Sequence, residues 1–150
     1  MRTTLTALGT CLALGLAACA GGDDDEAATE FRAQANAICA DYGPKIAVLA
    51  PPLEDVDEWA AIAADKADLL EAAVNGLRQL EPPDDLAESF GAWVTLKADA
   101  LATTRELQNA GGLHDQESAD AALASLEATE AEADPAAEEL ELEDCAGGDW

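Results

Sequence analysis

Residues 55–85 read DVDEWAAIAADKADLLEAAVNGLRQLEPPDD, and the spacing of apolar residues in this stretch decides the fold class. Asp55 with Glu58 is a capping-box pattern that starts a helix, and Glu81-Pro82-Pro83 ends it. Asn75-Gly76 would indicate a β-hairpin only between alternating strands, and no such alternation flanks it. Apolar residues recur at steps typical of one helical face, at Val56, Trp59, Ala63, Leu70, Ala73, Leu77 and Leu80.

Three more helices are predicted on either side of this stretch. The first keeps its apolar phase across Gly43-Pro44, which predicts a kink and not a chain reversal. Asp85 with Glu88 is expected to cap the third helix, Gly111-Gly112 to end it, and Pro135 to interrupt the fourth. The three apolar stripes are formed by Phe31, Ala35, Ile38, Tyr42, Ile46 and Leu49; by Leu86, Phe90, Trp93, Ala100, Thr104 and Leu107; and by Ala119, Leu123, Leu126, Ala133, Ala137 and Leu140.

The composition favours helices as well. The 150 residues include 36 Ala and 20 Leu but only 3 Ile and 4 Val, and strands are normally rich in β-branched residues. Four helices with short connections predict an all-α, up-down-up-down four-helix bundle over residues 29–146. The length leaves room for this one domain and a targeting segment.

The N-terminus has the pattern of an export signal. An uncharged run, residues 5–18, is too short to cross a bilayer but matches the core of a signal peptide. The run ends in Leu16-Ala17-Ala18-Cys19, which resembles the lipobox of bacterial lipoproteins. The resemblance implies that residues 1–18 are removed and that Cys19 receives a diacylglyceryl group and a further acyl chain such as palmitate, which suffices for stable anchoring. An ordinary signal peptide, cleaved after Ala20, is the alternative.

Residues 19–28 are expected to form a flexible acidic linker, because two glycines and four acidic residues follow Cys19. About nine extended residues would reach roughly 30 Å and would hold the domain off an anionic membrane. Residues 147–150 are predicted to be a C-terminal tail.

Four cysteines define one disulfide. Cys11 would leave with the signal peptide and Cys19 would be lipidated, so Cys39 and Cys145 are the only pair left for an intramolecular bond in an oxidising compartment. The rival interpretation, a metal site, lacks further ligands because the single histidine, His114, lies far from any CxxC pair.

Three short motifs add a family likeness. Ala35-Asn36-Ala37-Ile38-Cys39, the stop at Leu80-Glu81-Pro82-Pro83, and a cysteine shortly after Leu140-Glu141-Leu142 resemble a group of small secreted proteins and lipoproteins of high-GC Gram-positive bacteria. The resemblance implies a disulfide-linked helical domain outside the cytoplasmic membrane, and it carries no catalytic residues over to this chain.

A charged layer is predicted inside the bundle. Lys66 and Lys97 occupy positions where their stripes expect apolar residues. Counting outward from the Pro82-Pro83 turn places the two lysines within about one turn of each other, and counting from Gly111-Gly112 brings Glu130 to the level of Lys97. The layer could fix helix register or bind an anion. The alternative is that both lysines lie at the edge of the stripe with their ammonium groups in water.

The remaining side chains point to binding and not to catalysis. No nucleophile lies beside a base, no phosphate loop or metal motif occurs, and no cofactor is predicted. Trp59, Phe90 and Trp93 are expected in the core, with a ligand-stacking platform as the alternative.

The net charge of the chain limits the classes of molecule that could be its partners. With 32 acidic and 7 basic residues, the net charge of −25 excludes nucleic acid and anionic headgroups as direct partners of the folded surface. Glu138-Glu139, Glu141 and Glu143-Asp144 are either a solvated face or a surface for a basic protein or divalent cations. We therefore expect a lipid-anchored, non-catalytic binding or interaction module at the outer face of the bacterial cytoplasmic membrane, with a small-ligand or metal carrier using the bundle interior as the alternative.

Overall fold

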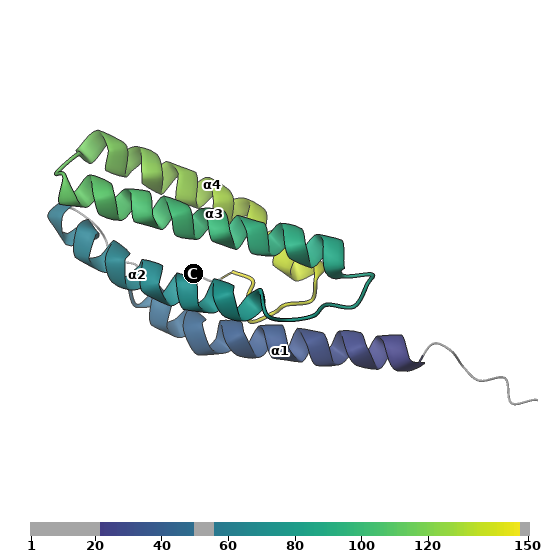
Figure 1. The fold of residues 1–150 in the computed structure, drawn as a ribbon. Helices are drawn as coiled ribbons and strands as arrows, with labels where there is room; N and C mark the ends of the chain where they lie inside the picture. The colour runs from purple at the N-terminus through teal and green to yellow at the C-terminus, as the bar shows by residue number, and fades with distance from the viewer. Residues whose placement is uncertain (1–21, 50–55, 148–150) are drawn as a thin grey trace, which may run out of the picture.

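A computed structural model describes residues 22–49 and 56–147 of the chain, as α-helices with short connections and no strand in those two ranges. The helices are α1 (Gly22–Ala47), α2 (Val56–Leu77), α3 (Ala87–Gly112) and α4 (Gln116–Glu139). Successive helices run in opposite directions, so the predicted up-down-up-down bundle is confirmed (Figure 1).

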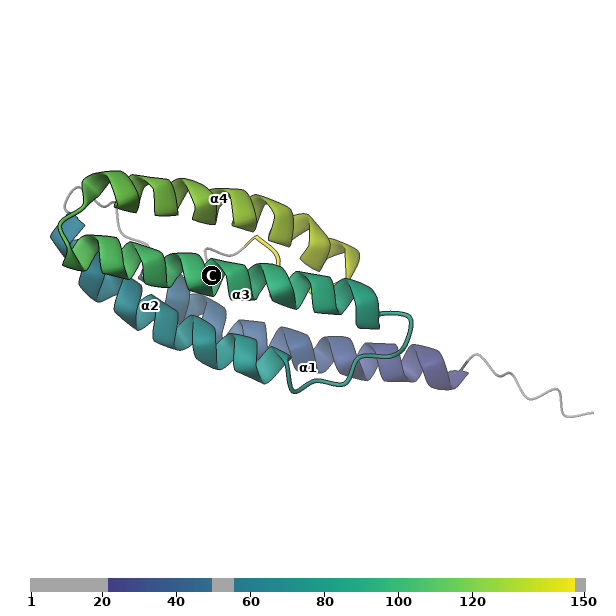
Figure 2. The same ribbon diagram turned by 45° about the horizontal axis from the view of Figure 1, so that its top comes forward.

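The four helices are not packed equally. α3 lies between α2 and α4 and packs along both, whereas α1 lies along α2 and is displaced toward the end of the bundle that holds the α2–α3 turn (Figures 1 and 2). Gly76 lies inside α2 and faces Ile38 of α1, which confirms that Asn75-Gly76 is not a hairpin turn.

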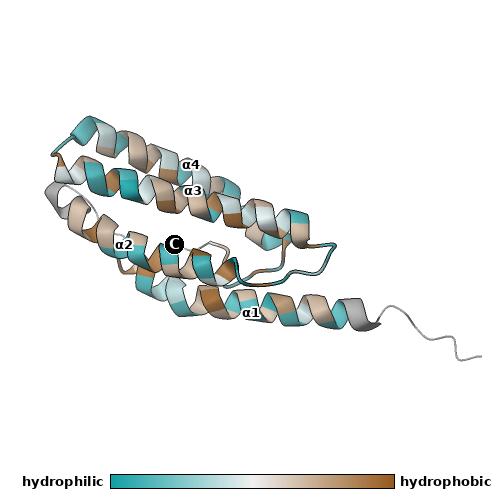
Figure 3. Ribbon diagram, viewed as in Figure 1, coloured by the Kyte–Doolittle hydropathy of each residue, from teal (hydrophilic) through white to brown (hydrophobic). Residues whose placement is uncertain are grey.

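The core has two parts. The larger cluster lies at the end where α1 packs, and it contains Phe31, Leu70, Phe90 and Trp93. The rings of Phe31 and Phe90 meet edge to face with centroids 4.8 Å apart. The smaller cluster, near the α3–α4 turn, consists of Ala63, Leu107, Ala110, Ala119 and Ala122. Hydrophilic and hydrophobic residues are mixed along every helix, as expected when one face of each helix is buried and the other is exposed (Figure 3).

Phe90 and Trp93 are 4% and 0% exposed, so their prediction as core residues is confirmed. The side chain of Trp59 lies outside the described part of the chain.

The start of α1 corrects the predicted linker. The helix begins at Gly22, so residues 22–28 of the expected linker 19–28 are helical. The sequence of residues 23–26 is all acidic, a composition compatible with the start of a helix because the helix dipole favours negative charge near its N-terminus. Ala28 is already buried, which ties this turn to the bundle. The signal peptide, the lipobox with Cys19, and residues 148–150 of the predicted tail lie outside the described residues.

Three of the predicted start, stop and break signals can be compared with the observed helices. The N-cap of α3 is Leu86, with no capping side chain, so the Asp85 capping box is wrong. Gly112 does end α3, but the left-handed residue after it is His114, with φ of 56°. Pro135 lies inside α4 without interrupting it, because it is on the exposed side and the helix stays anchored by buried alanines before and after it.

The N-cap of α4 gives a first prediction. Asp115 accepts hydrogen bonds from Ser118 N at 3.1 Å and Ser118 Oγ at 2.7 Å, and these bonds lower the pKa of Asp115 from its ordinary value of 3.8. We expect Asp115→Ala to lower the melting temperature at pH 7, and Asp115→Asn, which can still cap, to lower it less. The charge contributes to stability above pH 3.8, and this contribution disappears as the pH falls through the lowered pKa.

Thermal denaturation followed by circular dichroism at pH 7 and at pH 2.5 checks this prediction. A difference between wild type and Asp115→Ala that stays the same at both pH values would show that the ionised cap is not the cause.

Candidate functional site: a charged layer beside a disulfide clamp

A disulfide joins the second half of α1 to the C-terminal segment, which we define as residues 140–147. The Cα atoms of Cys39 and Cys145 are 5.1 Å apart, and both residues are fully buried. The predicted pairing is therefore confirmed, and it closes a chain segment with a sequence separation of 106 residues.

The C-terminal segment reaches Cys39 by turning back after α4. Glu141 adopts a left-handed conformation with φ of 59°, and Leu142 N donates to Ala137 O at 2.9 Å. Leu140 and Leu142 are 2% and 0% exposed, so the turn is held by burial of both leucines. The chain therefore reverses at Glu141, whereas Pro135, which was expected to interrupt the helix, lies inside α4.

Polar contacts fasten the same segment to α1. Arg32 Nε donates to Leu140 O at 3.0 Å and lies 3.2 Å from Glu141 Oε2. Asn36 Oδ1 accepts from Asp144 N at 3.0 Å. The segment is thus held against α1 by polar contacts as well as by the disulfide.

The structure brings Lys66, Lys97 and Glu130 together between α2, α3 and α4. Lys97 is 1% exposed, so the alternative with both ammonium groups in water is wrong for this residue. Lys66 Nζ lies 3.9 Å from Glu130 Oε1, and the two side chains are 11% and 25% exposed. This pair connects α2 to α4 across the bundle.

Asp134 is a fourth member of the charged layer, and the sequence analysis missed it. It lies one turn after Glu130 on α4, and its Oδ1 atom is buried with no hydrogen-bond partner in the described part of the chain. The spacing of four residues from Glu130 was the available signal. Two ammonium groups and two carboxylates make the layer neutral as a whole.

Burial governs the electrostatics of the layer. Desolvation lowers the pKa of Lys97, the carboxylates of Asp134 and Glu130 raise it, and the neighbouring charge of Lys66 lowers it; burial is the largest of these effects. The Lys97 Nζ atom also lies 6.0 Å from the centroid of the Trp93 ring, at the outer limit of a cation–π contact.

The charged layer is packed and not open. Four hollows on the described surface, of about 340 to 660 Å³, are lined by other residues. The position of the charged layer between helices suits a role in fixing the register of the helices, because a shift of one helix would leave a buried charge without its partner.

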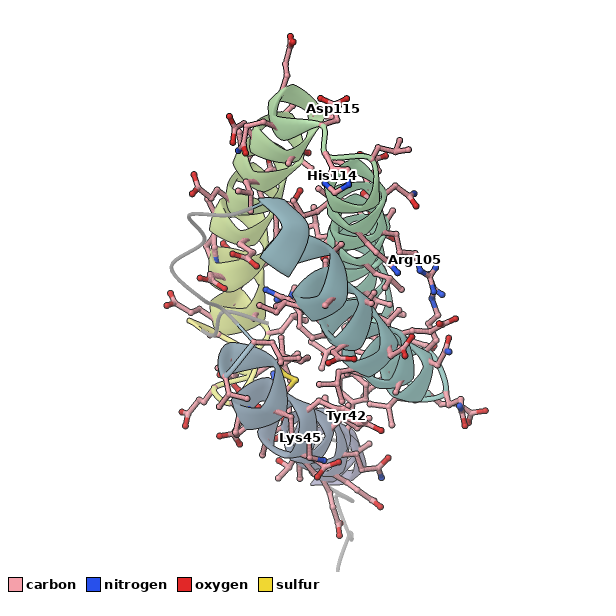
Figure 4. The ribbon with its side chains drawn as sticks, turned by 90° about the vertical axis from the view of Figure 1, so that its left-hand side faces the viewer. Tyr42, Lys45, Arg105, His114 and Asp115 are labelled. Atoms are coloured by element: carbon pink, nitrogen blue, oxygen red, sulfur yellow. A yellow bond between two sulfur atoms is a disulfide. The ribbon has the colours of Figure 1, made fainter. Side chains whose placement is uncertain are left out.

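Other predicted side chains lie on the surface. His114 is exposed in the α3–α4 turn, and so are Glu138, Glu139, Glu141, Glu143 and Asp144. Figure 4 shows His114 and Asp115 at this turn, away from Tyr42 and Lys45 of α1. Among the described residues, no group of three His, Cys, Asp or Glu side chains could hold a metal ion. No described helix has the length and apolar character needed to cross a bilayer.

Comparison of the chain with protein-family models, curated proteins and solved structures finds no match. The resemblance to small exported proteins of high-GC Gram-positive bacteria therefore stays a prediction from its short motifs.

Proposed function

We propose that the protein is an exported, lipid-anchored, non-catalytic binding module at the outer face of the bacterial cytoplasmic membrane. The observation that carries this proposal is the buried Cys39–Cys145 disulfide. Structural disulfides form and persist mainly in oxidising compartments, which agrees with the export signal and the Leu16-Ala17-Ala18-Cys19 motif.

The proposed partner is a basic extracytoplasmic protein. The net charge of −25 attracts cationic surfaces and repels nucleic acid and anionic lipid. The disulfide fixes the C-terminal segment to α1, so exposed carboxylates are presented on a cross-linked scaffold, which limits the entropy lost when a partner binds.

A second candidate function is a carrier that uses the bundle interior. The convergence of Lys66, Lys97, Glu130 and Asp134 favours it, because such a set can recognise a small zwitterion or anion. Titration with phosphate, sulfate and glycine, read as a rise in melting temperature, tests this function. A rise that disappears in Lys97→Met supports the carrier, and no rise in the wild type contradicts it.

The lipid anchor gives a direct prediction. We expect Cys19→Ala to move the protein from the membrane fraction to the medium, since a lipidated cysteine would be the attachment. The matched control is Cys11→Ala, which alters a cysteine that the proposal removes with the signal peptide and should leave the protein membrane-bound. Fractionation with immunoblotting measures both variants, and full membrane association of Cys19→Ala would refute the anchor.

A further inference from the structure

The α3–α4 turn is the end of the bundle farthest from the start of α1 (Figure 1). α3 alone has 26 residues and so spans about 39 Å. Cys19 lies three residues before Gly22, a distance of at most about 10 Å. On the proposed function, the membrane lies at the α1 end, and the α3–α4 turn points away from it.

A groove of about 440 Å³ lies at this far end, between the last turns of α3 and the first turns of α4. We name it the distal groove. Its base is formed by alanines, including Ala110 and Ala122, and its rim includes Glu106, Asn109, Leu113 and Asp115. Small residues at the base leave room for an inserted side chain.

The rim combines an apolar and an acidic side. Leu113 is 76% exposed, which is unusual for a leucine on a bundle whose other described leucines are buried or half-buried. Glu106 and Asp115 are both exposed, and the first turns of α4 add Glu117 and Asp120. The nearest arginine along the chain, Arg105, is paired with Glu71 at 2.7 Å and lies on the side of α3 that faces α2. The groove therefore presents negative charge around an apolar edge.

The turn that carries Leu113 is fixed before any partner binds. Leu113 N donates to Asn109 O and Ala110 O at 3.1 and 3.2 Å, and Asp115 N donates to Ala110 O at 2.9 Å. Holding an exposed apolar side chain on a rigid turn lowers the entropy lost on binding.

We propose that the distal groove is the docking surface for a basic segment of the protein partner, with an aliphatic side chain against Leu113 and flanking lysines or arginines facing Glu106 and Asp115. Charge complementarity selects this occupant, because the exposed carboxylates of the rim repel an acidic segment and add nothing to the contact that a neutral segment makes with Leu113. The inference rests on the proposed function and assigns its binding surface.

Fluorescence anisotropy tests the proposal with the full mature chain in neutral detergent micelles. The probe is a labelled Lys-Lys-Leu-Lys-Leu-Lys-Lys peptide, compared with its Glu-Glu-Leu-Glu-Leu-Glu-Glu counterpart. We expect only the basic peptide to bind. Leu113→Ser should weaken its affinity about tenfold, because the peptide can then no longer bury Leu113 in the complex. The double change Glu106→Gln with Asp115→Asn, in which asparagine keeps the N-cap, should weaken binding similarly and flatten its salt dependence.

Two controls separate docking from general attraction to an acidic protein. Val48→Ser changes another exposed apolar residue, 81% exposed and directly after α1, and Glu88→Gln with Asp84→Asn removes two exposed carboxylates near the opposite end. Both should leave the affinity within about twofold. Equal losses in the controls and in the groove variants, or unchanged binding in Leu113→Ser, would overturn the inference. The two experiments fail separately. If Cys19→Ala releases the protein from the membrane but the peptide does not bind at the distal groove, the proposed anchored module stands and only its assigned docking surface is refuted.

Discussion

Replacing Cys39 and Cys145 together with alanine should lower the free energy of unfolding by about 4–5 kcal/mol, because the bond closes a loop of 106 residues in the unfolded chain. The loss is a large share of the ~5–15 kcal/mol typical of a domain. Without the bond, the C-terminal segment would be held to α1 by non-covalent contacts, which include those of Arg32, Asn36 and the two buried leucines.

Urea denaturation with and without a thiol reductant measures this effect. Reductant should bring the wild type to the stability of the double variant and should leave the double variant unchanged. A double variant within about 1 kcal/mol of the oxidised wild type would show that the contacts of the C-terminal segment suffice without the bond.

The second large effect is expected from Lys97→Met. Methionine fills a similar volume, but it leaves the buried Asp134 Oδ1 atom without the nearby ammonium charge, and breaking a buried charge pair costs about 3–5 kcal/mol. The matched control is Lys45→Met, because Lys45 is a half-exposed lysine paired with Asp41 on the same helix, and its loss should cost less than about 0.5 kcal/mol.

A double variant and a pH series test the same mechanism. Lys97→Met with Asp134→Leu removes both charges and should recover most of the loss. The folded pKa of Lys97 lies below its ordinary value of 10.5, so the unfolded chain binds more protons between the two values. The wild type should therefore gain stability relative to Lys97→Met as the pH rises through that window. A single variant as stable as Lys45→Met would contradict the buried layer.

Two kinds of sequence evidence predicted the fold: the periodicity of the apolar residues, and the elimination of other partners for Cys39 and Cys145. The helical stripes gave the number and order of the helices, because their period matches one helix face. The pairing of Cys39 with Cys145 was predicted because the N-terminal pattern assigned other roles to Cys11 and Cys19. The charged layer was predicted because Lys66 and Lys97 interrupt two apolar stripes.

What the sequence did not predict depends on packing between distant elements. Periodicity defines the buried face of α1 but not its displacement along the bundle axis. The acidic run at 23–26 has the composition of a linker and becomes helical where Ala28 and Phe31 are buried. The left-handed residues His114 and Glu141 lack the glycine that normally marks such a turn, so no local signal placed the chain reversal at Glu141.

The position of the disulfide also decides how the molecule carries tension. A pull between the start of α1 and the residues that follow Cys145 would pass along α1 to Cys39 and across the bond to Cys145. The 105 residues between the two cysteines, which include α2, α3 and α4, lie outside that load path. A force along this path would strain α1 and its contacts, and the disulfide would keep that force from passing through the backbone of α2, α3 and α4.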